Sequence, residues 1–190
     1  MTTLTIFNDF DPVRELSRTT VHSEISDQLS KHGVRLERWE ASVPLQPGAD
    51  SEDVLQAYAA DVSRLNEEGY STVDVVRLVP DKTDPEWATK AKGARAKFLN
   101  EHTHSDDEVR FFVEGSGAFY LRMDQQVLAV ICEAGDLISV PAGVTHWFDM
   151  GATPSFTAIR LFKIPEGWVG DFTGSEISSK YPTFDELVAA

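Results

Sequence analysis

Three histidines and one glutamate are spaced so that they could bind a metal ion. His102 and His104 are separated by one residue, Glu108 follows four residues later, and His146 lies downstream. Side chains two residues apart on a strand share a face, so the first two imidazoles would project together. The turn-forming segment Ser105–Asp107 predicts a hairpin that brings Glu108 back beside both rings. Imidazole suits iron, nickel, copper and zinc, and the carboxylate shifts the preference toward harder divalent ions.

The specificity of this pattern comes from the full set. A single histidine on a strand is most often a surface residue or a satisfied core residue, and His-x-His alone is a weak signal. Here Glu108 is added, and the turn Pro141–Gly143 comes directly before the strand that carries His146. We therefore interpret the four residues as metal ligands, whereas His22 and His32, in or beside a polar helix, are interpreted as structural.

Composition and charge exclude several other classes of protein. The chain has 190 residues, 42% of them hydrophobic, which is enough to bury a core and argues against disorder. The net charge of -14 without a basic cluster argues against a nucleic-acid partner and against an anionic membrane surface. The single cysteine, Cys132, cannot form an intrachain disulfide, and the N-terminus has no signal-peptide pattern. No apolar stretch is long enough to span a bilayer, so we expect a cytoplasmic protein.

Hydrophobic periodicity divides the chain near Phe98. Before this point helices and strands are mixed, and after it short apolar runs alternate with turns, which is typical of an antiparallel sandwich or barrel. The predicted helices cover residues 23–32, 50–68, 84–97 and 183–187. The predicted strands cover residues 4–7, 34–39, 73–79, 108–113, 118–123, 127–132, 137–140, 146–149 and 156–162. We interpret 1–190 as one domain, with a mixed flank over 1–98, a metal-binding barrel core over 99–165 and a C-terminal extension over 166–190.

The motifs around the candidate ligands resemble those of the cupins. The first cupin motif is matched by His102, His104, Glu108 and Gly115, and the second by Gly135, Pro141, Gly143 and His146. The second motif often ends in Asn, and this chain has Met150 there. Because that Asn is not a metal ligand, the difference does not affect the predicted metal site. The resemblance implies a mainly β fold, a jelly-roll barrel or double-stranded β-helix, with several flanking α-helices.

Longer segments resemble the acireductone dioxygenases, in particular their bacterial branch, over nearly the whole chain. The matching segments are residues 4–7, 33–39, 97–104, 107–115, 146–151, 156–160 and 165–168. The resemblance implies an enzyme of methionine salvage that cleaves the enediol 1,2-dihydroxy-3-keto-5-methylthiopentene with dioxygen. With iron(II) the family makes 4-methylthio-2-oxobutanoate and formate, and with nickel(II) some members make 3-methylthiopropanoate, formate and carbon monoxide.

The same resemblance implies one Fe²⁺ or Ni²⁺ ion per chain, with Co²⁺ or Mn²⁺ as substitutes, and a monomer. The ligand set agrees with this chemistry, because a divalent ion with one carboxylate and three neutral imidazoles carries a net charge of about +1. Octahedral coordination would leave two adjacent positions for a bidentate enediolate, with the metal acting as template and Lewis acid.

Two arginines are candidates for binding the dianion. Arg110 lies two residues after Glu108 and would face the same interior, where a buried cation needs an anionic partner. The enediolate would be that partner, through charge-assisted hydrogen bonds. The family resemblance likewise implies that Arg110 stabilises the dianion. Arg160, within an apolar strand, is the second candidate. The alternative for both is a structural ion pair with a carboxylate.

Three aromatic residues and two acids complete the candidate site. Phe148 shares the parity of His146 and would point inward, whereas Phe98 and Trp168 could line the pocket around the methylthio tail; core packing is the alternative for all three. For Glu101 and Asp107 the resemblance implies roles in metal incorporation and in relaying metal-dependent change. Each could instead be a solvated acid or a partner that orients a ligand histidine.

Other functions stay open at the level of sequence. Another cupin enzyme, such as a zinc-dependent sugar isomerase or a different enediol dioxygenase, is disfavoured by the extended match over residues 98–115. A non-catalytic cupin module would often lack a ligand, whereas this chain keeps all four. The sequence does not choose between iron and nickel, since both accept the same ligands.

Overall fold

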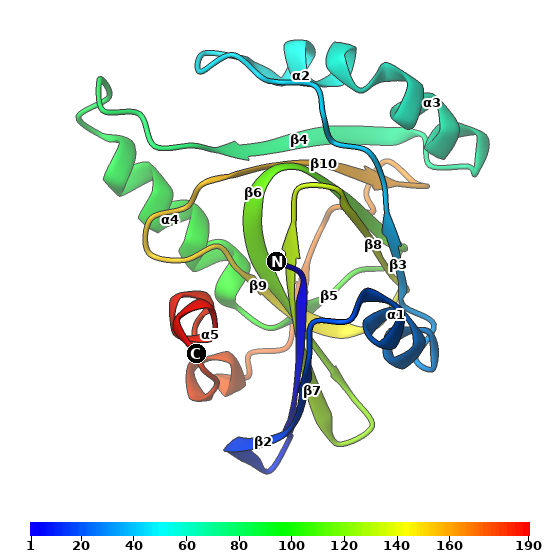
Figure 1. Cartoon of the computed structure of the whole chain (residues 1–190), viewed down its shortest axis with the longest axis vertical. Helices are drawn as coiled ribbons and strands as arrows, with labels where there is room; N and C mark the ends of the chain where they lie inside the picture. Colours follow the sequence, from blue (N-terminus) through cyan, green and yellow to red (C-terminus); the bar gives the residue numbers. More distant parts are fainter.

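Two facing β-sheets that share one long strand, β6 (Glu108–Met123), form the centre of the molecule (Figure 1). The computed structural model describes residues 1–190. One sheet has the order β11-β5-β9-β6-β7-β1-β2, and the other has the order β3-β8-β6-β10-β4. The remaining strands are β1 (Thr3–Asn8), β2 (Asp11–Thr19), β3 (Arg35–Arg38), β4 (Thr72–Leu78), β5 (His102–Thr103), β7 (Gln126–Glu133), β8 (Asp136–Val140), β9 (Thr145–Asp149), β10 (Phe156–Phe162) and β11 (Asp171–Phe172). All pairings are antiparallel, and the predicted mainly β cupin barrel is confirmed.

β6 passes from one sheet to the other at Gly115. Residues up to Gly115 pair with β8 and β10, and residues from Ser116 onward pair with β7 and β9. Gly115 has φ +67°, and a Cβ there would lie 1.8 Å from the carbonyl oxygen of Ser155. Only glycine fits this close approach. The prediction of two separate strands was therefore wrong: the glycine-rich segment bends one continuous strand.

Five helices cover the outside of the barrel: α1 (His22–Ser30), α2 (Ser51–Ala57), α3 (Ala59–Glu67), α4 (Trp87–Leu99) and α5 (Phe184–Ala189). In Figure 1, α2 and α3 lie along β4 at the top, and α4 and α5 lie on the left side of the barrel. The single helix predicted over residues 50–68 is divided at Tyr58, whose backbone leaves the helical region at φ -113° and ψ 28°. The buried Tyr58 donates its hydroxyl to the carbonyl of Val43, which accompanies the break.

Three short or exposed elements were not predicted: β2, β11 and the 3-10 helix η1 (Ile177–Lys180). β2 pairs only with β1, and almost all of its side chains are exposed. Without a buried face, its sequence has no alternation of apolar and polar residues to indicate a strand. β11 has only two residues, which is too short for any periodicity.

Aromatic side chains from both sheets fill the barrel interior. Phe112 and Phe156 belong to the sheet that contains β10, whereas Phe119 and Phe148 belong to the sheet that contains β9. All four are at most 1% exposed, and they form one cluster with α1 and β1. This packed layer closes the barrel beneath the candidate ligands. No helix of the structure has both the length and the apolar composition needed to cross a membrane.

Candidate metal centre

The three candidate histidines meet on the inner face of the barrel. His102 on β5 lies directly opposite His146 on β9, and His104 follows in the loop after β5. The ring centroids are 4.5–5.3 Å apart, and one nitrogen from each ring lies within 4.8 Å of the other two. The predicted hairpin between β5 and β6 was wrong, because β5 pairs with β9 and β11 instead.

The backbone sets the tautomer of each imidazole. The Nδ1 atoms of His102, His104 and His146 lie 2.7, 3.0 and 2.8 Å from the carbonyl oxygens of Asn100, Val169 and Val144. A carbonyl can only accept, so each Nδ1 carries the proton and donates it. The three Nε2 atoms are then left with free lone pairs, which is the form of imidazole that binds metals.

Glu108 reaches the histidines from the other sheet. Its Oε2 lies 3.3 Å from Nε2 of His146 and 3.6 Å from Nε2 of His104. Both Oε2 and His146 Nε2 are buried without a hydrogen-bond partner. Lone pairs held this close repel one another unless a cation lies between them. The donor set therefore fits a divalent metal ion held by three imidazoles and one carboxylate.

Burial keeps these groups in the protonation states that a metal requires. Burial, followed by the nearby His146, lowers the pKa of His102 to about 4, and burial also lowers the pKa of His104. Burial alone would raise the pKa of Glu108. However, the Arg110 charge and then the nearby His146 outweigh it and hold the pKa of Glu108 well below its usual value. Near neutral pH His102 and His104 are thus neutral and Glu108 is ionised.

Arg110 is buried beside Glu108 and is only partly satisfied. Its Nη2 donates to Glu108 Oε1 at 2.6 Å, while its Nε and Nη1 are buried with no hydrogen-bond partner. The guanidinium lies 4.5 and 4.6 Å from the ring centres of Phe148 and Phe119. These aromatic faces stabilise a cation but cannot accept the N–H bonds of Nε and Nη1, which lie in the plane of the guanidinium. Two unmet donors on a buried cation are suited to an anionic ligand.

Arg160 forms an ion pair with Asp74, and such a structural ion pair was the alternative to a role in substrate binding. Its Nε and Nη2 donate to the two carboxylate oxygens of Asp74 at 3.0 and 2.6 Å. It nevertheless lines the same cavity as Arg110 and the histidines.

This cavity of about 330 Å³ opens beside the metal centre. Its lining residues are Lys97, Phe98, His102, His104, Arg110, Arg160, Trp168, Val169, Gly170 and Phe172. Phe98 and Trp168 thus lie on the cavity wall. Phe148 is buried one layer deeper, beneath Arg110 and against Phe98 at a centroid distance of 6.2 Å.

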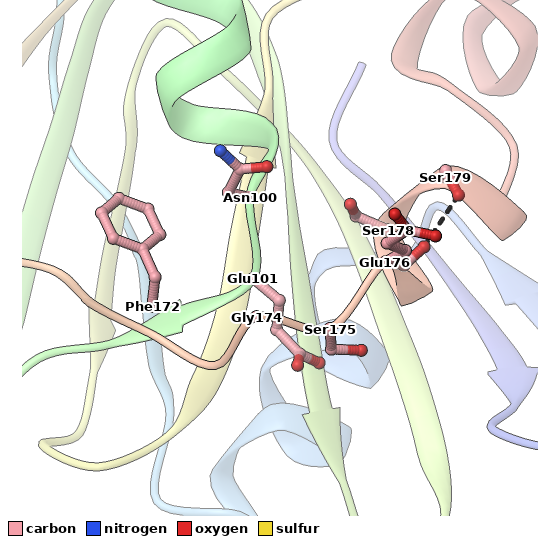
Figure 2. Close-up of a pocket in the computed structure, with 8 residues that line it drawn as sticks. All are labelled: Asn100, Glu101, Phe172, Gly174, Ser175, Glu176, Ser178 and Ser179. Atoms are coloured by element: carbon pink, nitrogen blue, oxygen red, sulfur yellow. Dashed lines mark hydrogen bonds between the residues drawn. The ribbon is translucent and has the colours of Figure 1, made fainter.

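The two flanking acids point away from the three imidazoles. Figure 2 shows the Glu101 carboxylate beside Ser175 and turned away from Phe172, whose ring packs against His102. Glu101 accepts from Thr173 at 2.6 Å and from Arg122 at 3.3 Å.

Asp107 is likewise engaged with its surroundings. It accepts from the backbone N–H of Ala142 at 3.0 Å and pairs with Lys163 at 2.7 Å. Both acids therefore hold loops around the metal centre, Glu101 the segment after β11 and Asp107 the turn before β9. Neither carboxylate lies among the metal-facing atoms.

Sequence reasoning missed two contributors to the site. Phe172 on β11 packs against His102 with the ring centres 5.6 Å apart, and Asp74 on β4 binds Arg160. A two-residue strand gives no signal for the first. The second, Asp74, could have been found as an acidic residue within a mostly apolar strand, a signal similar to the one that singled out Arg160.

Comparisons with known proteins agree with this centre. The sequence model of the ARD/ARD' family matches residues 3–170. The chain belongs to the acireductone dioxygenase family. It is 52% identical over 190 residues to acireductone dioxygenase 1 of Nocardia farcinica, covering 99% of this chain and all of the relative. It is 56% identical to the acireductone dioxygenase of Parvibaculum lavamentivorans, covering 97% and 98% of the two chains.

A solved structure of the same family supports the metal centre. The acireductone dioxygenase from Bacillus anthracis, with a cadmium ion in its active centre, matches with a TM-score of 0.74 and 29% identity. The match covers 90% of this chain and 98% of that one. This protein is accordingly an enzyme, a dioxygenase with a cupin fold and a metal-binding cluster of three histidines, and it acts on a small molecule.

Proposed function

We propose that the enzyme cleaves the acireductone 1,2-dihydroxy-3-keto-5-methylthiopentene with dioxygen in methionine salvage. With iron(II) the products are 4-methylthio-2-oxobutanoate and formate, and with nickel(II) they are 3-methylthiopropanoate, formate and carbon monoxide. The observation that carries the proposal is the convergence of unpartnered Nε2 and Oε2 atoms beside Arg110, which has two unmet donors. A cation and an anion are both needed to satisfy these buried groups.

The charges of the site match a dianionic enediolate. A divalent ion with Glu108 contributes about +1, and Arg110 raises this to about +2, while Arg160 and Asp74 cancel each other. When bound through His102, His104, His146 and Glu108, the metal would act as a template and Lewis acid for the enediolate oxygens.

Arg110 would orient the substrate through its guanidinium, which lines the cavity and has no protein partner for Nε and Nη1. The aromatic rings behind the guanidinium, Phe119 and Phe148, hold it in one position and exclude water. Phe98 and Trp168 give the cavity an apolar wall against which the methylthio tail packs. Because the guanidinium is already in place, its reorganisation costs little during the reaction.

Glu101 and Asp107 act through the loops that they anchor. By binding Thr173 and Ala142, respectively, they fix the two segments that border the imidazoles. We propose that changes in the metal alter these loops and that Glu101 assists metal incorporation from the side opposite the cavity. The family resemblance further leads us to expect a cytoplasmic protein that is a monomer. Light scattering of the metal-loaded protein would measure its molar mass and so test the monomer.

Product analysis with each metal tests the proposed reaction. Apoprotein loaded separately with iron(II) or nickel(II) should remove the enediolate absorbance in air, and unloaded protein should not. Iron(II) should give 4-methylthio-2-oxobutanoate and formate in equal amounts, and nickel(II) should instead give 3-methylthiopropanoate, formate and carbon monoxide. An unchanged absorbance with fully loaded protein would refute the assignment.

An arginine pair supplies the matched control. Arg110→Ala should keep its metal, measured by elemental analysis, but lose at least about a hundredfold in kcat/KM, as expected for a lost charge-assisted contact in a buried site. Arg64→Ala, on exposed α3, should retain both metal and turnover. Equal turnover in the two variants would remove Arg110 from the mechanism.

A further inference from the structure

Three charged residues lie side by side across three strands at the cavity. Arg110 on β6 is directly opposite Arg160 on β10, and Arg160 is directly opposite Asp74 on β4. Like charges directly opposite one another on neighbouring strands are destabilising. Asp74 is the residue that balances this pair, since it binds Arg160 on the side away from Arg110.

The Asp74 carboxylate also fixes how the guanidinium of Arg160 is oriented. It accepts from Nε and Nη2 in a two-point contact, so the guanidinium cannot rotate without breaking both hydrogen bonds. Nη1 of Arg160 has no hydrogen-bond partner in the protein and is accessible to solvent. The side chain is only 11% exposed and lines the cavity beside Arg110. The free edge of the guanidinium is therefore available to a molecule in the cavity.

We propose that Asp74 is a positioning residue, which holds Arg160 so that its Nη1 donates to the anionic substrate beside Arg110. The proposal rests on the function proposed above and deepens it. Asp74 contributes in two ways: it fixes the donor, and it neutralises a second cation that would otherwise be repelled by Arg110. Its side chain is 48% exposed, so it lies at the rim and does not itself contact the reacting atoms.

Asp74→Asn tests the positioning role, because asparagine has the same shape but accepts through one oxygen only. We expect KM for the enediol to rise about tenfold with kcat within about twofold, the size of effect of one substrate hydrogen bond to a charged group. Metal content should be unchanged. A lower KM would mean that the lost negative charge outweighs the lost orientation, and an unchanged KM would mean that Asp74 does not act on the substrate; either result overturns the proposal.

The same three strands provide a matched control. Arg77 on β4 pairs with Glu114 on β6 and donates to Thr157 on the intervening strand β10, away from the cavity. Glu114→Gln removes the negative charge from this ion pair, as Asp74→Asn does from the other. It should leave KM unchanged, so a rise in KM in both variants would show a general loosening of the sheet and refute a specific role for Asp74.

A double-mutant cycle separates action through Arg160 from direct action. Asp74→Asn should raise KM in the wild-type background but not in the Arg160→Ala background, where there is no guanidinium left to position. Equal increases in both backgrounds would show that Asp74 acts independently of Arg160, which contradicts the proposal.

Binding of oxalate, a nonreacting dianion, gives a readout that does not depend on turnover. Calorimetric titration of the nickel(II)-loaded proteins, with metal content measured again afterwards, should show about tenfold weaker binding in Asp74→Asn and wild-type binding in Glu114→Gln. If wild-type protein fails to consume the enediol while oxalate binding follows this pattern, the proposed function fails and the role of Asp74 stands. If wild-type protein turns over but oxalate binds Asp74→Asn as tightly as wild type, the positioning role is refuted.

Discussion

The backbone of Gly117 on β6 lies so close to the ring of Phe148 that there is no room for a methyl group at this position. A Cβ at Gly117 would lie 2.3 Å from Cζ and 2.9 Å from Cε2 of Phe148, whereas carbon atoms in contact are about 3.5–4.0 Å apart. The ring would have to move by more than 1 Å. It is 1% exposed and enclosed by Phe119, Phe156 and Arg110, so it has no free space to enter. Gly117→Ala therefore forces strain into the layer that supports Arg110.

The expected loss of stability follows from two opposing terms. Overpacking a core by one methyl group costs about 1–3 kcal/mol. Replacing glycine by alanine also restricts the unfolded chain, and this effect offsets about 0.4–1 kcal/mol of the overpacking cost. The net destabilisation is then about 1–2 kcal/mol, which for a chain of this length lowers Tm by about 2–8 °C.

A second glycine gives the opposite expectation for the same substitution. Gly93 lies within α4, and a Cβ there meets no atom within 4 Å. Gly93→Ala should stabilise the helix by about 0.5–1 kcal/mol and raise Tm. Thermal unfolding of both variants by circular dichroism, with metal removed, measures the difference. A Tm for Gly117→Ala at or above that of wild type would refute the packing argument, since unfolded-state effects alone would then account for both variants.

Three further outcomes are expected. Chelation of the metal should lower Tm, as followed by differential scanning fluorimetry. Nickel(II) at about 100 times its Kd should restore about 2.7 kcal/mol of folding stability in wild type but little in His104→Ala. Lys97→Ala, at the cavity mouth, should lower kcat/KM about threefold at low ionic strength and have no effect in concentrated salt; Lys92→Ala on the same helix should match wild type at both. Burial raises the pKa of Asp149, but Arg95 and two backbone N–H groups outweigh it and hold this pKa below its ordinary 3.8. Its contribution is therefore fully present above pH 3.8 and is lost as pH falls further, so urea unfolding should show Asp149→Asn less stable at pH 7 and closer to wild type at pH 3.

The histidines could be located from the sequence because local spacing decides where they lie. His102 and His104 needed only the geometry of an extended chain, and His146 needed only the turn before it. How Glu108 reaches them could not be predicted, because the choice of partner for a two-residue strand is made by tertiary packing. β5 pairs with β9, and Glu108 approaches from the facing sheet at the start of β6.

The parity of a strand predicts which side a residue faces but not how deep it lies. Phe148 and His146 share a face of β9, yet His146 meets the other imidazoles and Phe148 lies beneath Arg110. The depth depends on the bend in β6, where Gly117 leaves space for the ring. In the same way, Arg160 was recognised as a cation in an apolar strand, but its partner is 86 residues away on β4.

The course of β6 explains how the barrel combines a polar centre with an apolar core. Its first half supplies Glu108 and Arg110 to one sheet, and its second half supplies Phe119 to the other. Because Gly115 turns the strand between them, the guanidinium of Arg110 lies over the ring of Phe119, nine residues further along the same strand. The buried cation is thus held by the strand that also carries the carboxylate beside it. A change at the bend should therefore disturb the metal centre and the hydrophobic core together, which a change at either end of β6 would not do.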